Sequence, residues 1–228
     1  MSSDAPANDP AARIHRWLLL AMQGAMAVSF LGALWERQWL TAAVVAGIFG
    51  LMAAPAVLGQ RLALRIPAEF ELLALAFVFA ALFLGEVRDY YHRIWWWDLA
   101  LHTLSGLLLG LLGFLLIYVL NQDERVDLHL RPRFIALFAC SLAIAMGALW
   151  EIFEFAMDQV FGLNMQKPMF GDPSGKTDTM WDLIVDSLGA VLISGLGWWY
   201  MARQQTSFID TWIRKFIARN PRLFERAP

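Results

Sequence analysis

Acidic side chains and one histidine recur at helical spacing in three apolar stretches of the chain. Each set has intervals of three or four residues, which places its members on one face of an α-helix. The sets are Asp98 and His102; Glu151, Glu154 and Asp158; and Asp178, Asp182 and Asp186. Ionisable side chains cost free energy inside a membrane, so residues of this kind within a span indicate a functional site.

Carboxylates that lie close together in a medium of low dielectric cannot all ionise unless a cation compensates them. One imidazole with several carboxylates suits Mn, Fe, Zn or Mg, and inward-facing Asp-x-x-x-His and Glu-x-x-Glu pairs resemble the metal sites of helical bundles. We therefore predict a divalent-metal site with five ligands: Asp98, His102, Glu151, Glu154 and Asp182. Whether Asp158 and Asp186 join it stays open.

A bound metal would lower the pKa of a coordinated water, and Glu151 or Glu154 could then act as the catalytic general base. The turn-rich segment 160–180 contains Lys176, a candidate for binding an anionic substrate, and Asp178, a second candidate substrate-binding residue. Nothing in this segment matches a phosphate-cradling loop with a strand before it and a helix after it.

The composition indicates the environment of these residues. Of 228 residues, 59% are hydrophobic and only 17% are charged, against about 25% charged residues in soluble domains. The net charge is −2 and the basic residues are dispersed, so nucleic-acid binding is excluded. The single cysteine, Cys140, excludes an intrachain disulfide and a zinc cluster made of cysteines.

A helix needs about 20 apolar residues to cross a bilayer. Six stretches approach this length, of which the third is the shortest: 17–35, 39–58, 71–86, 95–120, 134–157 and 181–201. The predicted fold is thus all-α, a polytopic membrane helix bundle of about six transmembrane helices. The predicted divisions are a disordered tail over 1–12, the bundle over 13–203 and a cytoplasmic amphipathic tail over 204–228.

Basic residues set the orientation, because cytoplasmic loops carry the excess of Lys and Arg. Thirteen of the eighteen basic residues fall on the side of the termini, and five fall on the other side. Both termini are therefore predicted to be cytoplasmic. In this orientation all three polar sets occupy the outer half of the membrane, and a rise of about 1.5 Å per residue places them at similar depths.

Two further patterns concern packing. Gly106 and Gly110 form a GxxxG motif that Gly113 continues, and we interpret it as a site of close helix contact. In the tail, apolar residues recur at helical spacing opposite Arg214, Lys215 and other basic side chains. This pattern predicts an amphipathic helix on the cytoplasmic leaflet.

The acidic motifs occur in a characteristic order. They are Asp98-x-x-x-His102, Trp150-Glu151-x-x-Glu154, Gly171-Asp172, and Asp178-x-x-Trp181-Asp182 leading to Gly189-Ala190. This order resembles the YjdF-like family of bacterial inner-membrane proteins, which has no assigned activity, and Asp186 departs from its pattern. A more distant similarity links the chain to the VanZ-like membrane proteins. The resemblance implies a location in the bacterial inner membrane.

Three functions remain open. The first is a metal-dependent membrane enzyme acting on a lipid-linked or envelope substrate, with the lipid bilayer as its surroundings. The second is an ion- or proton-coupled transporter, which is disfavoured because the inner parts of the last three spans, 107–120 and 135–148 among them, contain no Asp, Glu, Lys, Arg or His. The third is a structural or assembly protein in which the polar cluster holds helices together.

Overall fold

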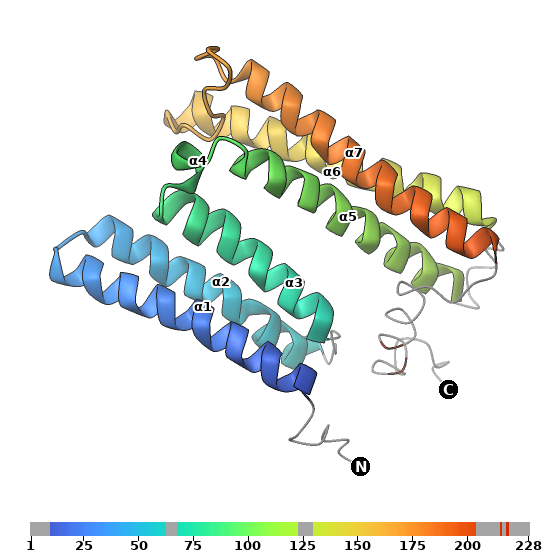
Figure 1. Cartoon of the computed structure of the whole chain (residues 1–228), viewed down its shortest axis with the longest axis horizontal. Helices are drawn as coiled ribbons and strands as arrows, with labels where there is room; N and C mark the ends of the chain where they lie inside the picture. The colour runs from blue at the N-terminus through green and yellow to red at the C-terminus, as the bar shows by residue number, and fades with distance from the viewer. Residues whose placement is uncertain (1–9, 63–67, 123–129, 204–214, 216–217, 219–228) are drawn as a thin grey trace. The chain divides into compact units, whose positions relative to one another are not determined.

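The computed structural model describes residues 10–62, 68–122, 130–203, 215 and 218 (Figure 1). Over these residues the secondary structure is helical apart from turns and one isolated bridge between Met169 and Asp172. The elements in chain order are α1 (Pro10–Trp35), α2 (Trp39–Leu62), α3 (Ala68–Val78), the π-helix η1 (Phe79–Val87), α4 (Tyr90–Arg93), α5 (Trp97–Gln122), α6 (Pro132–Phe161) and α7 (Lys176–Ala202). The chain divides into two compact units, residues 1–93 and 94–228.

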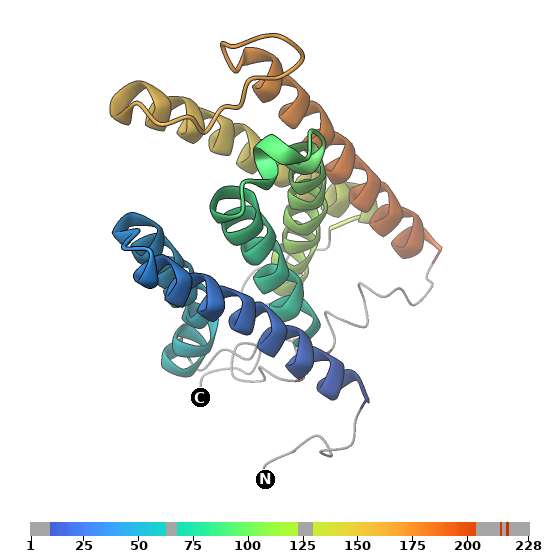
Figure 2. The same ribbon diagram turned by 60° about the vertical axis from the view of Figure 1, so that its left-hand side comes forward.

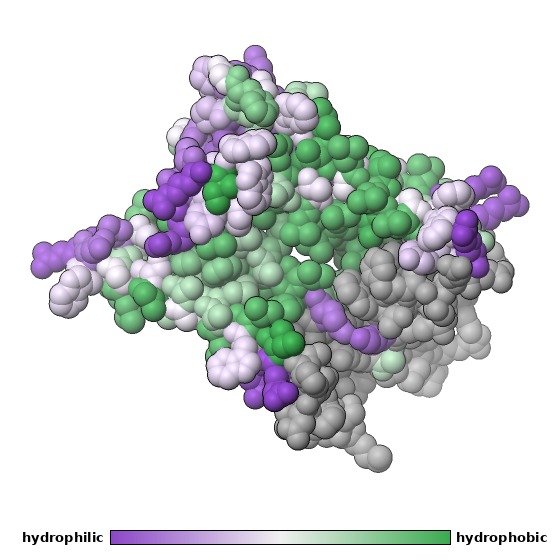
Figure 3. Space-filling view, viewed as in Figure 1, coloured by the Kyte–Doolittle hydropathy of each residue, from purple (hydrophilic) through white to green (hydrophobic). Residues whose placement is uncertain are grey.

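The predicted all-α membrane bundle is confirmed. Among the described residues, five helices are long and apolar enough to cross a membrane: Arg16–Trp35, Glu69–Val87, Trp97–Ile117, Pro132–Phe161 and Lys176–Ala202. The stretch predicted as the second span contributes the shorter apolar helix Trp39–Ala53. On the face seen in Figure 3, hydrophobic residues occupy the middle of the described part and hydrophilic ones gather toward its edges. Exposed apolar side chains such as Leu137 and Leu188 indicate surfaces that lipid covers.

Helix α1 already begins at Pro10, inside the segment predicted as a disordered tail. The predicted amphipathic helix over 204–228 lies almost entirely outside the described residues, so it stays a prediction.

The first unit packs α1, α2, α3 and η1 around an apolar core that includes Met26, Val45 and Phe83. The predicted third span was short, but α3 continues directly into η1, so a helical stretch of sufficient length forms from Glu69 to Val87. Gly85 in η1 lies against the ring of Tyr91, where a Cβ would overlap the ring. The small residue therefore allows the turn after η1 to fold back on it.

In the second unit, α5, α6 and α7 all contact one another, and α5 lies alongside α6 and α7 in both ribbon views (Figures 1 and 2). Glycines permit close approach of the backbones: Gly106 faces the carbonyl oxygen of Asp186, Gly189 faces that of Thr103, and Gly113 faces Ala139. The prediction that the glycine motif is a site of helix contact is confirmed. Because these contacts involve the main chain, they fix how the three helices lie against one another.

Candidate functional site

His102 is at the centre of a buried polar cluster built by α5, α6 and α7. Asp98 and His102 come from the first two turns of α5, and Asp182 and Asp186 come from the first half of α7. Glu151 comes from the second half of α6. Four of these side chains are buried, and Asp98 is partly buried. The cluster therefore lies toward the end of the unit at which α5 and α7 begin and α6 ends.

Each ring nitrogen of His102 faces two carboxylates. Nε2 lies 3.7 Å from Oδ1 of Asp98 and 3.9 Å from Oδ2 of Asp182. Nδ1 lies 3.4 Å from Oδ2 of Asp186 and 3.7 Å from Oε1 of Glu151. One imidazole thus connects acids from all three helices, and its two sides have different partners.

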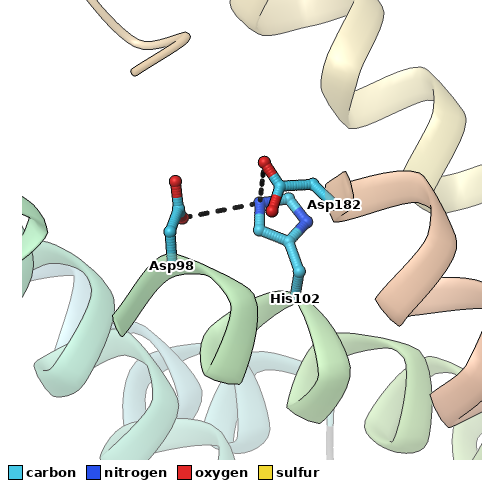
Figure 4. A group of neighbouring side chains, drawn as sticks. All are labelled: Asp98, His102 and Asp182. Carbon is cyan, nitrogen blue, oxygen red and sulfur yellow. Dashed lines mark ion pairs between the residues drawn. The ribbon is translucent and has the colours of Figure 1, made fainter. Parts of the chain in front are cut away.

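The Nε2 side is the part of the cluster where three candidate ligand atoms gather. One ligand atom each from Asp98, His102 and Asp182 lie within 4.8 Å of one another, and Figure 4 shows both carboxylates approaching the same ring nitrogen. Ligand atoms around a tetrahedral ion with bonds of about 2.0 Å lie about 3.3 Å apart. The three ligand atoms lie farther apart than this, so binding an ion would require the side chains to move toward one another.

Two of the acids are buried without a hydrogen bond. Asp182 is 0% exposed and Glu151 is 4% exposed. Neither oxygen of either carboxylate has a hydrogen-bond partner within the described parts of the chain. A buried carboxylate in this condition is costly unless it is paired, protonated or bound to a metal. Asp182 faces Nε2 of His102, so a cation on that side of the ring would offset the cost of burying Asp182.

The predicted ligands therefore separate into three groups. Ligand atoms of Asp98, His102 and Asp182 lie within 4.8 Å of one another. Glu151 contacts His102, but through Nδ1 on the opposite side of the ring. Glu154 is buried and accepts a hydrogen bond of 2.8 Å from Nε1 of Trp150. The Trp150 N–H partly satisfies the hydrogen-bonding capacity of Glu154, and among the described residues Glu154 is not part of the group formed by Asp98, His102 and Asp182.

The sequence left open whether Asp186 and Asp158 join the metal site, and the two residues have different positions in the structure. Asp186 belongs to the cluster, where it contacts His102 and accepts a hydrogen bond from Oγ of Ser105. Asp158 instead accepts the backbone N–H groups of Met165 at 2.7 Å and Gln166 at 3.0 Å. It therefore holds the first residues of the loop between α6 and α7. The interval from Asp182 to Asp186 is the sequence signal that places Asp186 on the same face.

The candidate substrate-binding residues are at the start of α7. Lys176 is exposed at the first position of this helix. Asp178 is 1% exposed, and its Oδ2 accepts the backbone N–H of Lys167 at 2.6 Å, whereas Oδ1 has no hydrogen-bond partner among the described residues. Asp178 thus ties the loop to α7, a structural role that the sequence did not indicate.

Asp172 lies in the loop between α6 and α7 and orders that loop through hydrogen bonds. It accepts hydrogen bonds from the backbone N–H of Ser174 at 2.8 Å, the backbone N–H of Thr177 at 3.1 Å and the hydroxyl of Thr177 at 2.8 Å. Donors from Ser174 and then Thr177 stabilise the charged form and hold the pKa of Asp172 well below its usual range. The loop beside the cluster is therefore ordered by carboxylates that bind backbone N–H groups.

The model of one protein family, described as "Predicted membrane protein (DUF2238)", matches residues 14–203. The chain belongs to the DUF2238 family. This membership agrees with the predicted resemblance to YjdF-like proteins, and the matched region contains every residue of the cluster around His102. The family description establishes a predicted membrane protein and assigns it no activity.

A relative of this DUF2238 protein occurs in Thermotoga maritima, where it is named "Uncharacterized protein". It is 31% identical over 125 residues, which cover 55% of this chain and 59% of the relative. The match thus spans less than two thirds of the relative's length. No solved structure matches the chain.

Proposed function

We propose that this protein is a multi-pass enzyme of the bacterial inner membrane that holds one divalent cation at Asp98, His102 and Asp182 and acts on a lipid-linked or envelope substrate. The observation that supports the proposal most strongly is Asp182, a fully buried carboxylate that faces Nε2 of His102 and has no hydrogen bond in the described chain. A cation is the partner that such a group lacks.

A divalent metal held there would supply a Lewis acid and a water of lowered pKa. Asp98 and Asp182 would provide two oxygen ligands and His102 one nitrogen, which leaves coordination positions for water and substrate. Glu151 is one candidate for the general base, because its buried carboxylate lies beside His102. Glu154, held by Trp150, is the second candidate.

The substrate class follows from where the cluster would lie. With both termini cytoplasmic, as the distribution of basic residues favours, the start of α7 and the loop before it face the extracytoplasmic side. Lys176 is exposed there and could bind an anionic group such as a phosphate. A substrate anchored in the outer leaflet would present its headgroup at this level.

Metal content tests the proposal directly. The full-length protein in nanodiscs, exchanged into zinc or manganese and then dialysed, is expected to retain about one ion per chain by elemental analysis. Asp182→Asn and His102→Gln should retain none, whereas Glu36→Gln, an exposed acid outside the cluster, should match the wild type. A wild-type protein without stoichiometric metal would refute the proposal.

One observation favours a second function, that of an interhelical fastener. An imidazolium between four carboxylates could hold α5, α6 and α7 together without any metal, because both ring nitrogens face acids. In that case His102→Gln should lower thermal stability in the presence of chelator, and added zinc should not raise the stability of the wild type.

A further inference from the structure

We propose that Asp186 is the positioning residue of the metal site. It holds the Nδ1–H of His102 so that Nε2 is presented to the ion, and this makes the site selective for zinc, manganese or iron over magnesium and calcium. The inference rests on the proposed metal site and adds to it the class of metal and a residue outside the ligand group.

The proton on the ring is assigned by the partners of Nδ1. Its neighbours are Oδ2 of Asp186 at 3.4 Å and Oε1 of Glu151 at 3.7 Å. Of the two ring nitrogens, only Nδ1 has a described carboxylate oxygen within hydrogen-bond distance, and an ionised carboxylate only accepts, so we assign the ring proton to Nδ1. In a neutral imidazole the lone pair is then on Nε2, the nitrogen that faces Asp98 and Asp182. The lone pair of the imidazole therefore faces the two other candidate ligands, Asp98 and Asp182.

Asp186, on α7, is itself held in place by contacts from α5 and α6. Its Oδ1 accepts a hydrogen bond from Ser105 on α5. On α6, Gly147 leaves the space in which its carboxylate lies, because a Cβ at position 147 would overlap Oδ2. Its backbone carbonyl on α7 packs against Gly106. These contacts confine a carboxylate that is only 2% exposed, in an orientation that faces His102.

The class of metal follows from the histidine. Imidazole is a preferred ligand of zinc, iron and other transition metals, whereas magnesium and calcium take oxygen ligands. A carboxylate that accepts the other ring N–H fixes the ring and raises its basicity, and removing such a partner typically costs about 10- to 100-fold in metal affinity. Asp98 and Asp182 alone would still attract magnesium, so Asp186 should affect transition metals selectively.

The test compares dissociation constants for zinc, manganese and magnesium in nanodiscs for the full-length wild type, Asp186→Asn and Gly147→Ala. Both variants should weaken zinc and manganese binding about 10- to 100-fold and leave magnesium binding nearly unchanged. Cobalt substitution adds a spectroscopic readout, because the visible d–d bands should shift if the imidazole is displaced. Gly195→Ala is the matched control, since nothing lies within 4 Å of a Cβ at that α7 position.

The outcomes separate the two proposals. A wild type that binds no metal refutes the proposed function and this inference together. A wild type that binds metal, with Asp186→Asn and Gly147→Ala binding zinc equally well, refutes only the inference. Equal weakening for all three ions also refutes it, because that pattern would follow from a general distortion of the bundle. Should Asp186→Asn fail to fold, Gly147→Ala and Ser105→Ala give the same comparison, since each disturbs the carboxylate without removing it.

Discussion

The Cα of Gly106 lies against the backbone carbonyl oxygen of Asp186, one helical turn along α5 from His102. No side chain separates the two helices at this point. The contact therefore fixes the distance between α5 and α7 at the depth where the polar cluster forms. Packing of the bundle and geometry of the candidate metal site depend on the same main-chain contact.

Gly106→Ala should lower the stability of the protein, because the added methyl group overlaps backbone that has little freedom to move. Overpacking of this kind typically costs about 1 to 3 kcal/mol. The midpoint of thermal unfolding in detergent measures the effect, with Gly195→Ala as the control in open space. The control should be neutral or slightly stabilised, since alanine favours the helix. Equal midpoints for both variants would contradict the close contact.

Asp182→Asn should be at least as stable as the wild type in the presence of chelator. The wild-type carboxylate is buried without a hydrogen bond in the described chain, and removing its charge removes a desolvation cost. Added zinc should then stabilise only the wild type, by about 2.7 kcal/mol when the free ion is at 100 times the dissociation constant. Thermal unfolding with and without zinc measures both effects, and a variant that zinc stabilises like the wild type would contradict this.

The residues of the cluster could be predicted from the sequence more completely than their arrangement. Periodicity places acids on one face of each helix, but it does not give the rotation of three helices relative to one another. Glu154 and Asp186 illustrate the difference. Both lie on a predicted polar face, yet Glu154 accepts a hydrogen bond from Trp150 and Asp186 reaches His102. Gly147 makes room for Asp186, and no pattern in the sequence of α6 indicates this role.

The membrane spans, too, could be predicted from the sequence only in part. The six apolar stretches coincide with helices, apart from Trp95 and Trp96, which form a turn before α5. Length alone did not reveal that α3 continues as the π-helix η1 and so completes the third span. Hydropathy identifies which segments are apolar, whereas the way in which a helix continues depends on packing, here of Gly85 against Tyr91.

Asp172→Asn should loosen the loop between α6 and α7 at neutral pH. The pKa of Asp172 is lowered in the folded state, so its contribution to loop stability is fully present above the unfolded value of about 4 and is lost as the pH falls from there through the lower folded pKa. Hydrogen exchange at the amides of Ser174 and Thr177 should be faster in the variant at neutral pH, and the difference should shrink in acid. The amides of α5 provide an internal control. A difference that is independent of pH would contradict the assigned role.

The side of the membrane that the cluster faces is tested by cysteine labelling. In a Cys140→Ala background, Ser174→Cys in the exposed loop before α7 should react with a membrane-impermeant maleimide in intact spheroplasts. Ser3→Cys in the amino-terminal segment should react only after lysis, since most basic residues fall on the side of the termini and such segments stay in the cytoplasm. The reverse pattern would place the cluster at the cytoplasmic face. An envelope substrate would then be out of reach, while the metal site, which depends on side-chain geometry alone, would be unaffected.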